Sequence, residues 1–214
     1  MRRITFYIHW IICSFCLIGQ SYGELSQTDV LVSEMTIIQQ NPQQMIEAVA
    51  AGKERALLCG NCHGKNGNSV RDYIPNLASQ NAAYLFNQFE KFANGERKDY
   101  VMSRLAKNLT REDRVNIALY FSQMQVEARD QPVASSAEGE KIYKGLCFTC
   151  HQQDGHGNGN YPRIAGQPYE YLKRTLNSFA GGNDRRANSP MAVIVKNLNE
   201  KQLLDVAAYV ASMP

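Results

Sequence analysis

The sequence predicts an all-α protein built from two tandem copies of one helical domain, and three observations lead to this prediction. A motif of two cysteines and a histidine occurs twice, 88 residues apart. The residues downstream of each motif also match, so the repeat covers most of the chain. Apolar residues recur at helical spacing in both copies, whereas the alternation typical of half-buried strands is scarce.

Residues 1–23 have the pattern of a secretory signal peptide. Arg2 and Arg3 precede an apolar run at residues 11–18, and small residues flank Tyr22. A retained membrane anchor is the alternative, but the run is well short of the roughly 20 apolar residues that a spanning helix needs. We therefore expect cleavage at the end of this segment and a secreted mature chain.

The composition is that of a globular protein of 214 residues, of which 44% are hydrophobic. The formal net charge of +3 falls by two when Arg2 and Arg3 leave with the signal segment. Such a near-neutral chain lacks the basic excess of a nucleic-acid-binding protein, so we expect no nucleic-acid partner.

Residues 24–45 form an extension without a counterpart in the second half. Leu31, Met35 and Ile38 have the spacing of a short amphipathic turn or two that ends before Pro42. We expect this extension to be a packing element or a linker.

Each half has the same predicted order of elements: a helix that runs into the cysteine motif, a loop rich in Gly and Asn, a second helix, a loop that carries a methionine, and a last helix. One face of each second helix is expected to be buried, because its apolar residues follow i, i+4, i+7 spacing. These residues are Leu85, Phe89 and Phe92, and then Leu172, Leu176 and Phe179.

The last helices have a start signal in both halves. Thr110 and Asn199 are the expected N-caps, and Asp113 and Gln202 follow three residues later, which predicts capping boxes. Residues 129–135 are polar and form the expected linker. The predicted domains are therefore 46–128 and 136–214.

The two motifs are Cys-x-x-Cys-His, the attachment signature of c-type haem. The cysteines bind the vinyl groups as thioethers, and the histidine is held under the iron. The residues concerned are Cys59, Cys62, His63, Cys147, Cys150 and His151. The sequence thus predicts two covalently bound haem c groups.

Other uses of the cysteines explain the motifs less well. One zinc ion shared by both pairs would give neither histidine a role. A thioredoxin-like redox pair needs a βαβ setting, which the helical pattern lacks. A disulfide within each pair would close a very small loop and strain the end of a helix.

A methionine is the expected second axial ligand of each iron. Met102 and Met191 lie 39 and 40 residues past the motif histidines, in the loops before the last helices. Met124 and Met213 close those helices, where methionine is usually core filler. We therefore favour Met102 and Met191.

Three further positions bear on the motifs. His156 is a rival ligand, but its Gly-rich turn favours a solvated loop. Pro75 and Pro162 follow the motif histidines by 12 and 11 positions, where a carbonyl could accept the imidazole Nδ1 proton. Such a bond would orient each histidine.

Matched basic pairs, Arg97-Lys98 and Arg185-Arg186, lie just upstream of the favoured methionines. They could mark docking edges for an anionic partner. A solvated face is the interpretation that we favour.

The motifs, each followed by P-x-L/I-A-x-Q and by a methionine before K-N-L, resemble the di-haem cytochrome c4 family over residues 46–214. The resemblance implies two class I cytochrome c folds with haems near a pseudo-twofold interface, in the bacterial periplasm or on its membrane surface. It implies electron transfer towards a terminal oxidase. By position, His63 and His151 would be the proximal ligands and Met102 and Met191 the distal ones.

The expected function is that of a one-electron carrier, not of an enzyme, because His/Met ligation fills both axial positions of each iron. Its partners would be a respiratory donor and an acceptor such as a terminal oxidase. An electron-transfer subunit of a dehydrogenase complex is an open alternative. A di-haem enzyme with one open iron, such as a peroxidase or a thiosulfate-oxidising cytochrome, is less favoured, because both methionines are matched and no mature cysteine is left over.

Overall fold

A computed structural model of the chain describes residues 27–129, 133–159, 161–182, 186 and 189–214. The predicted signal segment lies outside this part, as do positions 130–132 of the predicted linker. The described elements are helical, with no strand beyond isolated bridges. They are α1 (Gln27–Gln40), α2 (Pro42–Arg55), the 3₁₀ turn η1 (Ala56–Leu58), α3 (Gly60–His63), α4 (Ala82–Asn94), α5 (Met102–Asn108), α6 (Arg111–Ser122), α7 (Ala137–Ile142), the π turn η2 (Tyr143–Cys147), α8 (Phe148–His151), α9 (Tyr169–Ala180), α10 (Pro190–Val195) and α11 (Glu200–Ser212).

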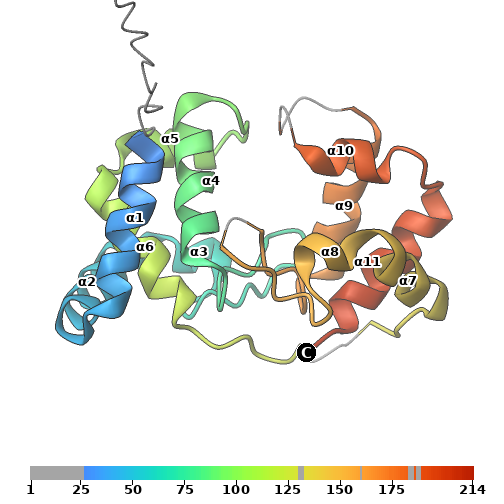
Figure 1. The fold of residues 1–214 in the computed structure, drawn as a ribbon, viewed down its shortest axis with the longest axis horizontal. Coiled ribbons are helices and arrows are strands. Elements are labelled where there is room, and N and C mark those ends of the chain that lie inside the picture. The colour runs from blue at the N-terminus through green and yellow to red at the C-terminus, as the bar shows by residue number, and fades with distance from the viewer. Residues whose placement is uncertain (1–26, 130–132, 160, 183–185, 187–188) are drawn as a thin grey trace, which may run out of the picture.

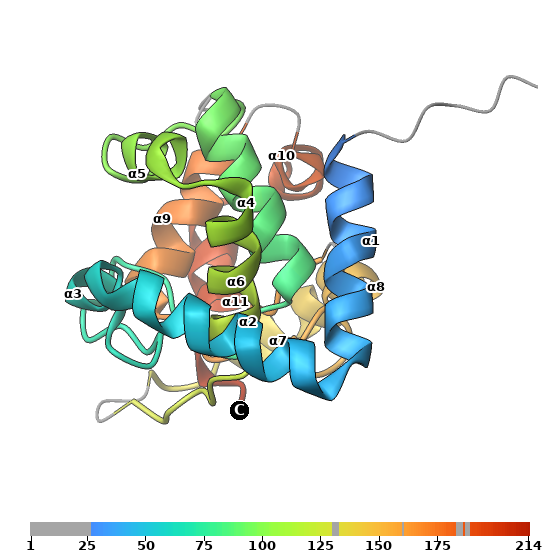
Figure 2. The same ribbon diagram turned by 90° about the vertical axis from the view of Figure 1, so that its left-hand side faces the viewer.

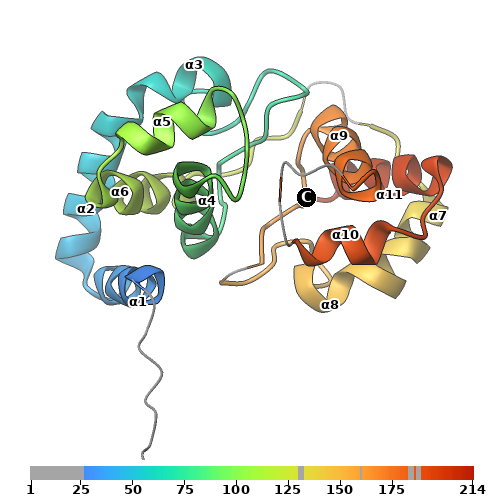
Figure 3. The ribbon, with the colours of Figure 1, turned by 90° about the horizontal axis from the view of Figure 1, so that it is seen from above.

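The helices form two lobes that lie side by side (Figure 1). Helices α1 to α6 make the first lobe and α7 to α11 the second, and the loops that follow the cysteine motifs meet between them (Figure 3). The predicted all-α fold with two tandem copies is confirmed.

The first and last helices of each copy cross with their backbones in contact. A Cβ atom added to Gly52 of α2 would lie 2.0 Å from the carbonyl oxygen of Asn116 in α6. Gly139 of α7 has the same relation, at 2.0 Å, to the carbonyl oxygen of Asp205 in α11. Both crossings therefore require a residue without a side chain.

The predicted buried faces and capping boxes are present. Leu85, Phe89 and Phe92 are buried on α4, and on α9 Leu172 and Phe179 are buried while Leu176 is half-buried. The capping boxes of α6 and α11 each have both reciprocal hydrogen bonds. The last helices thus begin where the sequence predicted.

The N-terminal extension is a longer helix than its pattern predicted. Helix α1 packs beside α2 and α4 in the first lobe (Figure 2). Met35, only 1% exposed, anchors α1 in the first-half core, with Leu31 and Ile38 packed nearby. Of the two expected roles, the structure supports packing.

The favoured methionines lie in short helices, which corrects the prediction that they lie in loops. Met102 begins α5, because Asp99 Oδ1 accepts hydrogen bonds from the backbone N–H groups of Val101 and Met102, at 3.0 and 2.9 Å. Met191 follows Pro190, whose fixed φ suits the first turn of α10. These local start signals outweigh the neighbouring loop-forming residues.

Candidate functional site

The first motif begins directly after η1 and forms one tight helical turn that includes α3. The backbone N–H groups of Cys62 and His63 both donate to the carbonyl oxygen of Cys59, at 3.1 and 2.9 Å. Gly64 then ends the turn with a φ of 78°. A Cβ atom there would lie 2.0 Å from the Asn68 carbonyl oxygen, so the chain leaves the motif through a position that only glycine fits.

Both motif histidines are buried and held in the same way. His63 is 8% exposed, and its Nδ1 lies 2.9 Å from the carbonyl oxygen of Pro75. His151 is 6% exposed, with Nδ1 3.0 Å from the carbonyl oxygen of Pro162. A carbonyl oxygen only accepts, so Nδ1 carries the proton and Nε2 keeps its lone pair for a metal. The predicted role of the two proline carbonyls is confirmed.

The surroundings keep both imidazoles neutral. Burial lowers the pKa of His63 below its ordinary value, and the bond to Pro75 opposes this only in part. Burial likewise lowers the pKa of His151. A neutral imidazole with Nδ1 engaged is the form that binds iron through Nε2.

The described cysteines suit thioether attachment better than the alternatives. Cys59, Cys62, Cys147 and Cys150 are all free thiols, so no disulfide forms among them. Burial raises the pKa of Cys59, and burial together with Cys150 raises that of Cys147 to about 11. Within the described ranges no cluster of three or more Cys, His, Asp or Glu side chains could hold a metal ion, which removes support for a shared zinc.

The four repeat-matched methionines occupy two kinds of position. Met102 and Met191 are half-buried at the starts of α5 and α10, each packed against the apolar core of its own half. Met124 and Met213 follow the ends of α6 and α11 and are also half-buried against the cores. Packing therefore does not by itself separate the two pairs.

One arginine of each basic pair, Arg97 and Arg186, is half-buried, which corrects the favoured interpretation of a solvated face for these two residues. Lys98 is exposed as expected, and Arg185 lies outside the described residues. Arg97 and Arg186 form an isolated backbone bridge between the halves. The Arg186 guanidinium donates to the Tyr171 hydroxyl at 2.9 Å, and that of Arg97 donates to Gln88 Oε1 at 2.7 Å. Burial would raise the pKa of Tyr171, but the two guanidinium groups outweigh it and lower the value to about 8. No local pattern revealed this contact, because its partners come from both halves.

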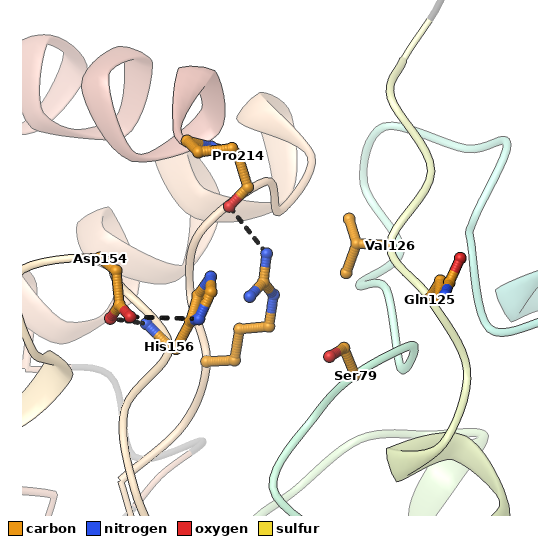
Figure 4. Close-up of a pocket in the computed structure, with 7 residues that line it drawn as sticks. Ser79, Gln125, Val126, Asp154, His156 and Pro214 are labelled. Atoms are coloured by element: carbon orange, nitrogen blue, oxygen red, sulfur yellow. Dashed lines mark hydrogen bonds and ion pairs between the residues drawn. The ribbon is translucent and has the colours of Figure 1, made fainter.

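His156 lies in a cleft between the halves (Figure 4). Ser79, Gln125 and Val126 line one side, and Asp154, His156 and Pro214 line the other. The exposed imidazole of His156 pairs with the Asp154 carboxylate at 3.2 Å. This placement agrees with the predicted solvated loop.

Arg163 lines the same cleft, and an unpaired donor on its side chain shows whether the residues here suit a haem. It is 6% exposed and donates to the Pro214 carbonyl oxygen at 2.9 Å, but its buried Nε has no partner. A buried N–H without a partner is costly, and haem carries two carboxylates that could accept from it. With the paired thiols and the neutral histidines, the residues fit a haem in each half.

Comparisons with known proteins agree with this fit. The family model "Cytochrome c" matches residues 136–214. Cytochrome c4 of Azotobacter vinelandii is 31% identical over 77% of this chain and 88% of its own length. A protein named thiosulfate dehydrogenase electron acceptor, from Thiomonas intermedia, is 30% identical over 77% of this chain and 82% of its own.

A solved structure extends the agreement to the fold. Reduced recombinant cytochrome c4 from Pseudomonas stutzeri superposes with a TM-score of 0.71 and 27% identity, covering 78% of this chain and 98% of the other. The similarity in sequence and in structure thus spans both halves and both motifs. The chain belongs to the cytochrome c4 family and binds haem c covalently, and Cys59 with Cys62 and Cys147 with Cys150 fit the two attachment motifs.

Proposed function

We propose that this chain is a periplasmic one-electron carrier in which both haem irons have histidine and methionine as axial ligands. The observation that carries the proposal is the equivalence of the two histidine sites. Each imidazole is buried, neutral and held through Nδ1 by a proline carbonyl, at 2.9 Å in one half and 3.0 Å in the other. An enzyme with one specialised iron would be expected to break this symmetry.

The proposed ligands are His63 with Met102 and His151 with Met191. When bound, haem supplies a one-electron ferric/ferrous couple. The histidines present Nε2 in a fixed orientation, because Nδ1 is held by the proline carbonyls. The methionines would supply a thioether to the opposite face and leave no open position for a substrate.

The proposed partners are redox proteins, a respiratory donor and an acceptor such as a terminal oxidase. A second candidate is an electron-accepting subunit of a dehydrogenase, favoured by the relative from Thiomonas intermedia that bears such a name. Purification from the native host under mild conditions separates the two. A free carrier elutes alone, whereas a subunit elutes with a dehydrogenase.

The periplasmic location rests on the signal pattern of residues 1–23. None of the helices in the described ranges is long and apolar enough to cross a membrane.

We predict that the mature protein begins near Glu24 and carries two haems. Intact mass spectrometry of the denatured protein checks both points in one measurement. Haem extracted by acidic organic solvent, or a mass that retains residues 1–23, would contradict them.

Carbon monoxide tests the carrier against the enzyme. We expect carbon monoxide to cause no change in the absorption spectrum of the reduced, unmodified protein at neutral pH, because both axial positions of each iron are filled. Stoichiometric binding to one haem would show an open iron and favour a di-haem enzyme over the carrier.

A further inference from the structure

Two glutamines, Gln80 and Gln167, cross the interface between the halves. Each is the last residue of its P-x-L/I-A-x-Q segment, so the two are equivalent in the repeat. Their side chains are buried, with 4% and 5% of their surface exposed. Each reaches the peptide group that holds the motif histidine of the opposite half.

Gln167 completes this connection for the first half. Its Oε1 accepts from the backbone N–H of Asn76 at 3.0 Å, and its Nε2 donates to the Asn76 carbonyl at 2.9 Å. The Asn76 N–H belongs to the same peptide group as the Pro75 carbonyl that binds His63 Nδ1. A continuous chain of hydrogen bonds thus runs from His63, through one peptide group, to Gln167.

Gln80 repeats the connection in the other direction. Its Oε1 accepts from the backbone N–H of Arg163 at 2.7 Å, and its Nε2 donates to the Arg163 carbonyl at 2.8 Å. That N–H shares its peptide group with the Pro162 carbonyl that binds His151 Nδ1 at 3.0 Å. Gln80 of the first half therefore hydrogen-bonds the peptide group that holds His151 in the second half.

Such a chain has an electronic effect as well as a structural one. An acceptor on a peptide N–H polarises the peptide group and makes its carbonyl oxygen a stronger acceptor. A stronger bond to Nδ1–H increases the basicity of the imidazole at Nε2. A more basic ligand favours ferric iron and so lowers the reduction potential. Because Asn76 and Arg163 are only 3% and 6% exposed, bulk water cannot replace the glutamines.

We propose that Gln80 and Gln167 are positioning residues that tune the reduction potential of the haem in the opposite half, through the peptide groups that hold His151 and His63. The proposal rests on the proposed function, since both histidines must be iron ligands. It makes each haem sensitive to the docking of the other half.

The test replaces each glutamine with methionine, which keeps most of the side-chain volume but has no carbonyl oxygen. Gln167→Met should raise the potential of the first-half haem, with a change of about twofold to tenfold in its reduced-to-oxidised ratio at a fixed applied potential; tenfold is 59 mV for one electron. Gln80→Met should shift the second-half haem instead. Redox titration followed by NMR, with haem methyl signals assigned to each half, measures both.

Asn81 offers a matched control at the same interface. Its Nδ2 donates across the interface to the carbonyl oxygens of His156 and Tyr161, at 3.1 and 2.6 Å. Neither carbonyl belongs to the peptide groups whose Pro75 and Pro162 carbonyls bind the motif imidazoles. Asn81→Ala should therefore leave both potentials unchanged, although it also removes contacts between the halves.

Gln167→Glu and Gln80→Glu keep an acceptor for the peptide N–H, and they test the proposal if a methionine variant fails to fold. In each of these glutamate variants, the reduction potential of the haem in the opposite half should fall rather than rise. A shift in the haem of the same half, equal shifts in both haems, or no shift would overturn the proposal. A failure of the proposed function would appear earlier, as carbon monoxide binding or an anomalous titration in the unmodified protein.

Discussion

Replacing Met102 with alanine should abolish the methionine-to-iron absorption of one haem in the ferric protein and lower that haem's reduction potential. Loss of the thioether removes a ligand that favours ferrous iron. The variant should also gain carbon monoxide binding at one haem and a weak peroxidase activity. Visible spectroscopy and redox titration of the full-length variant measure these changes.

Met124→Ala is the matched control, because Met124 is half-buried in the same half and packs against the same core. It should lower the free energy of unfolding by about 1 to 2 kcal/mol, less than for a fully buried methionine, and leave the spectrum unchanged. Met191→Ala and Met213→Ala should repeat the contrast in the second half. If the Met124 variant lost the absorption while the Met102 variant kept it, the proposed ligands would be wrong.

Features that depend on neighbours along the chain were predictable. The Cys-x-x-Cys-His motif placed the haem sites, and the capping boxes at Thr110 and Asn199 placed the starts of the last helices. The Pro75 carbonyl was predictable because a proline follows the motif histidine at nearly the same distance in both halves, 12 and 11 positions. In each case residue type and spacing together carry the physical cause.

Contacts between the halves were not predictable in the same way. Arg97 and Arg186 had the local pattern of surface charges, yet they meet across the interface. Gln80 and Gln167 were aligned as a repeat feature, but nothing in one loop shows that its side chain reaches the other half. Matched positions in a repeat are candidates for such symmetric contacts. Only the packing of the two halves against each other shows which of these residues touch.

The glycines at the helix crossings were also missed, because a glycine inside a helical pattern indicates only a loss of helix propensity. Gly52 and Gly139 occupy equivalent places, each with its Cα against a carbonyl of the last helix. No periodicity marks such a residue. The matched position in both copies is the signal that could have found it.

Gly139→Ala should destabilise the second half severely. The added Cβ would lie 2.0 Å from the Asp205 carbonyl oxygen and 2.9 Å from the Tyr209 Cβ, so α7 and α11 must move apart. Overpacking that displaces backbone costs about 3 kcal/mol or more, against about 1 kcal/mol gained in helix propensity. Thermal unfolding of the haem-loaded protein, followed by circular dichroism, should show a transition at much lower temperature.

Gly145→Ala is the control that isolates the crossing, because the two glycines lie in the same half and neither has a positive φ. A Cβ at Gly145 meets nothing within 4 Å, so alanine there should be neutral or slightly stabilising. Gly52→Ala should reproduce the loss in the first half, where the Cβ would lie 2.0 Å from the Asn116 carbonyl oxygen. Equal stability of the Gly139 and Gly145 variants would mean that the helices do not cross in backbone contact. The first-half variant should retain more structure, since α1 adds Met35 to the first-half core and the core of the second half has no equivalent helix.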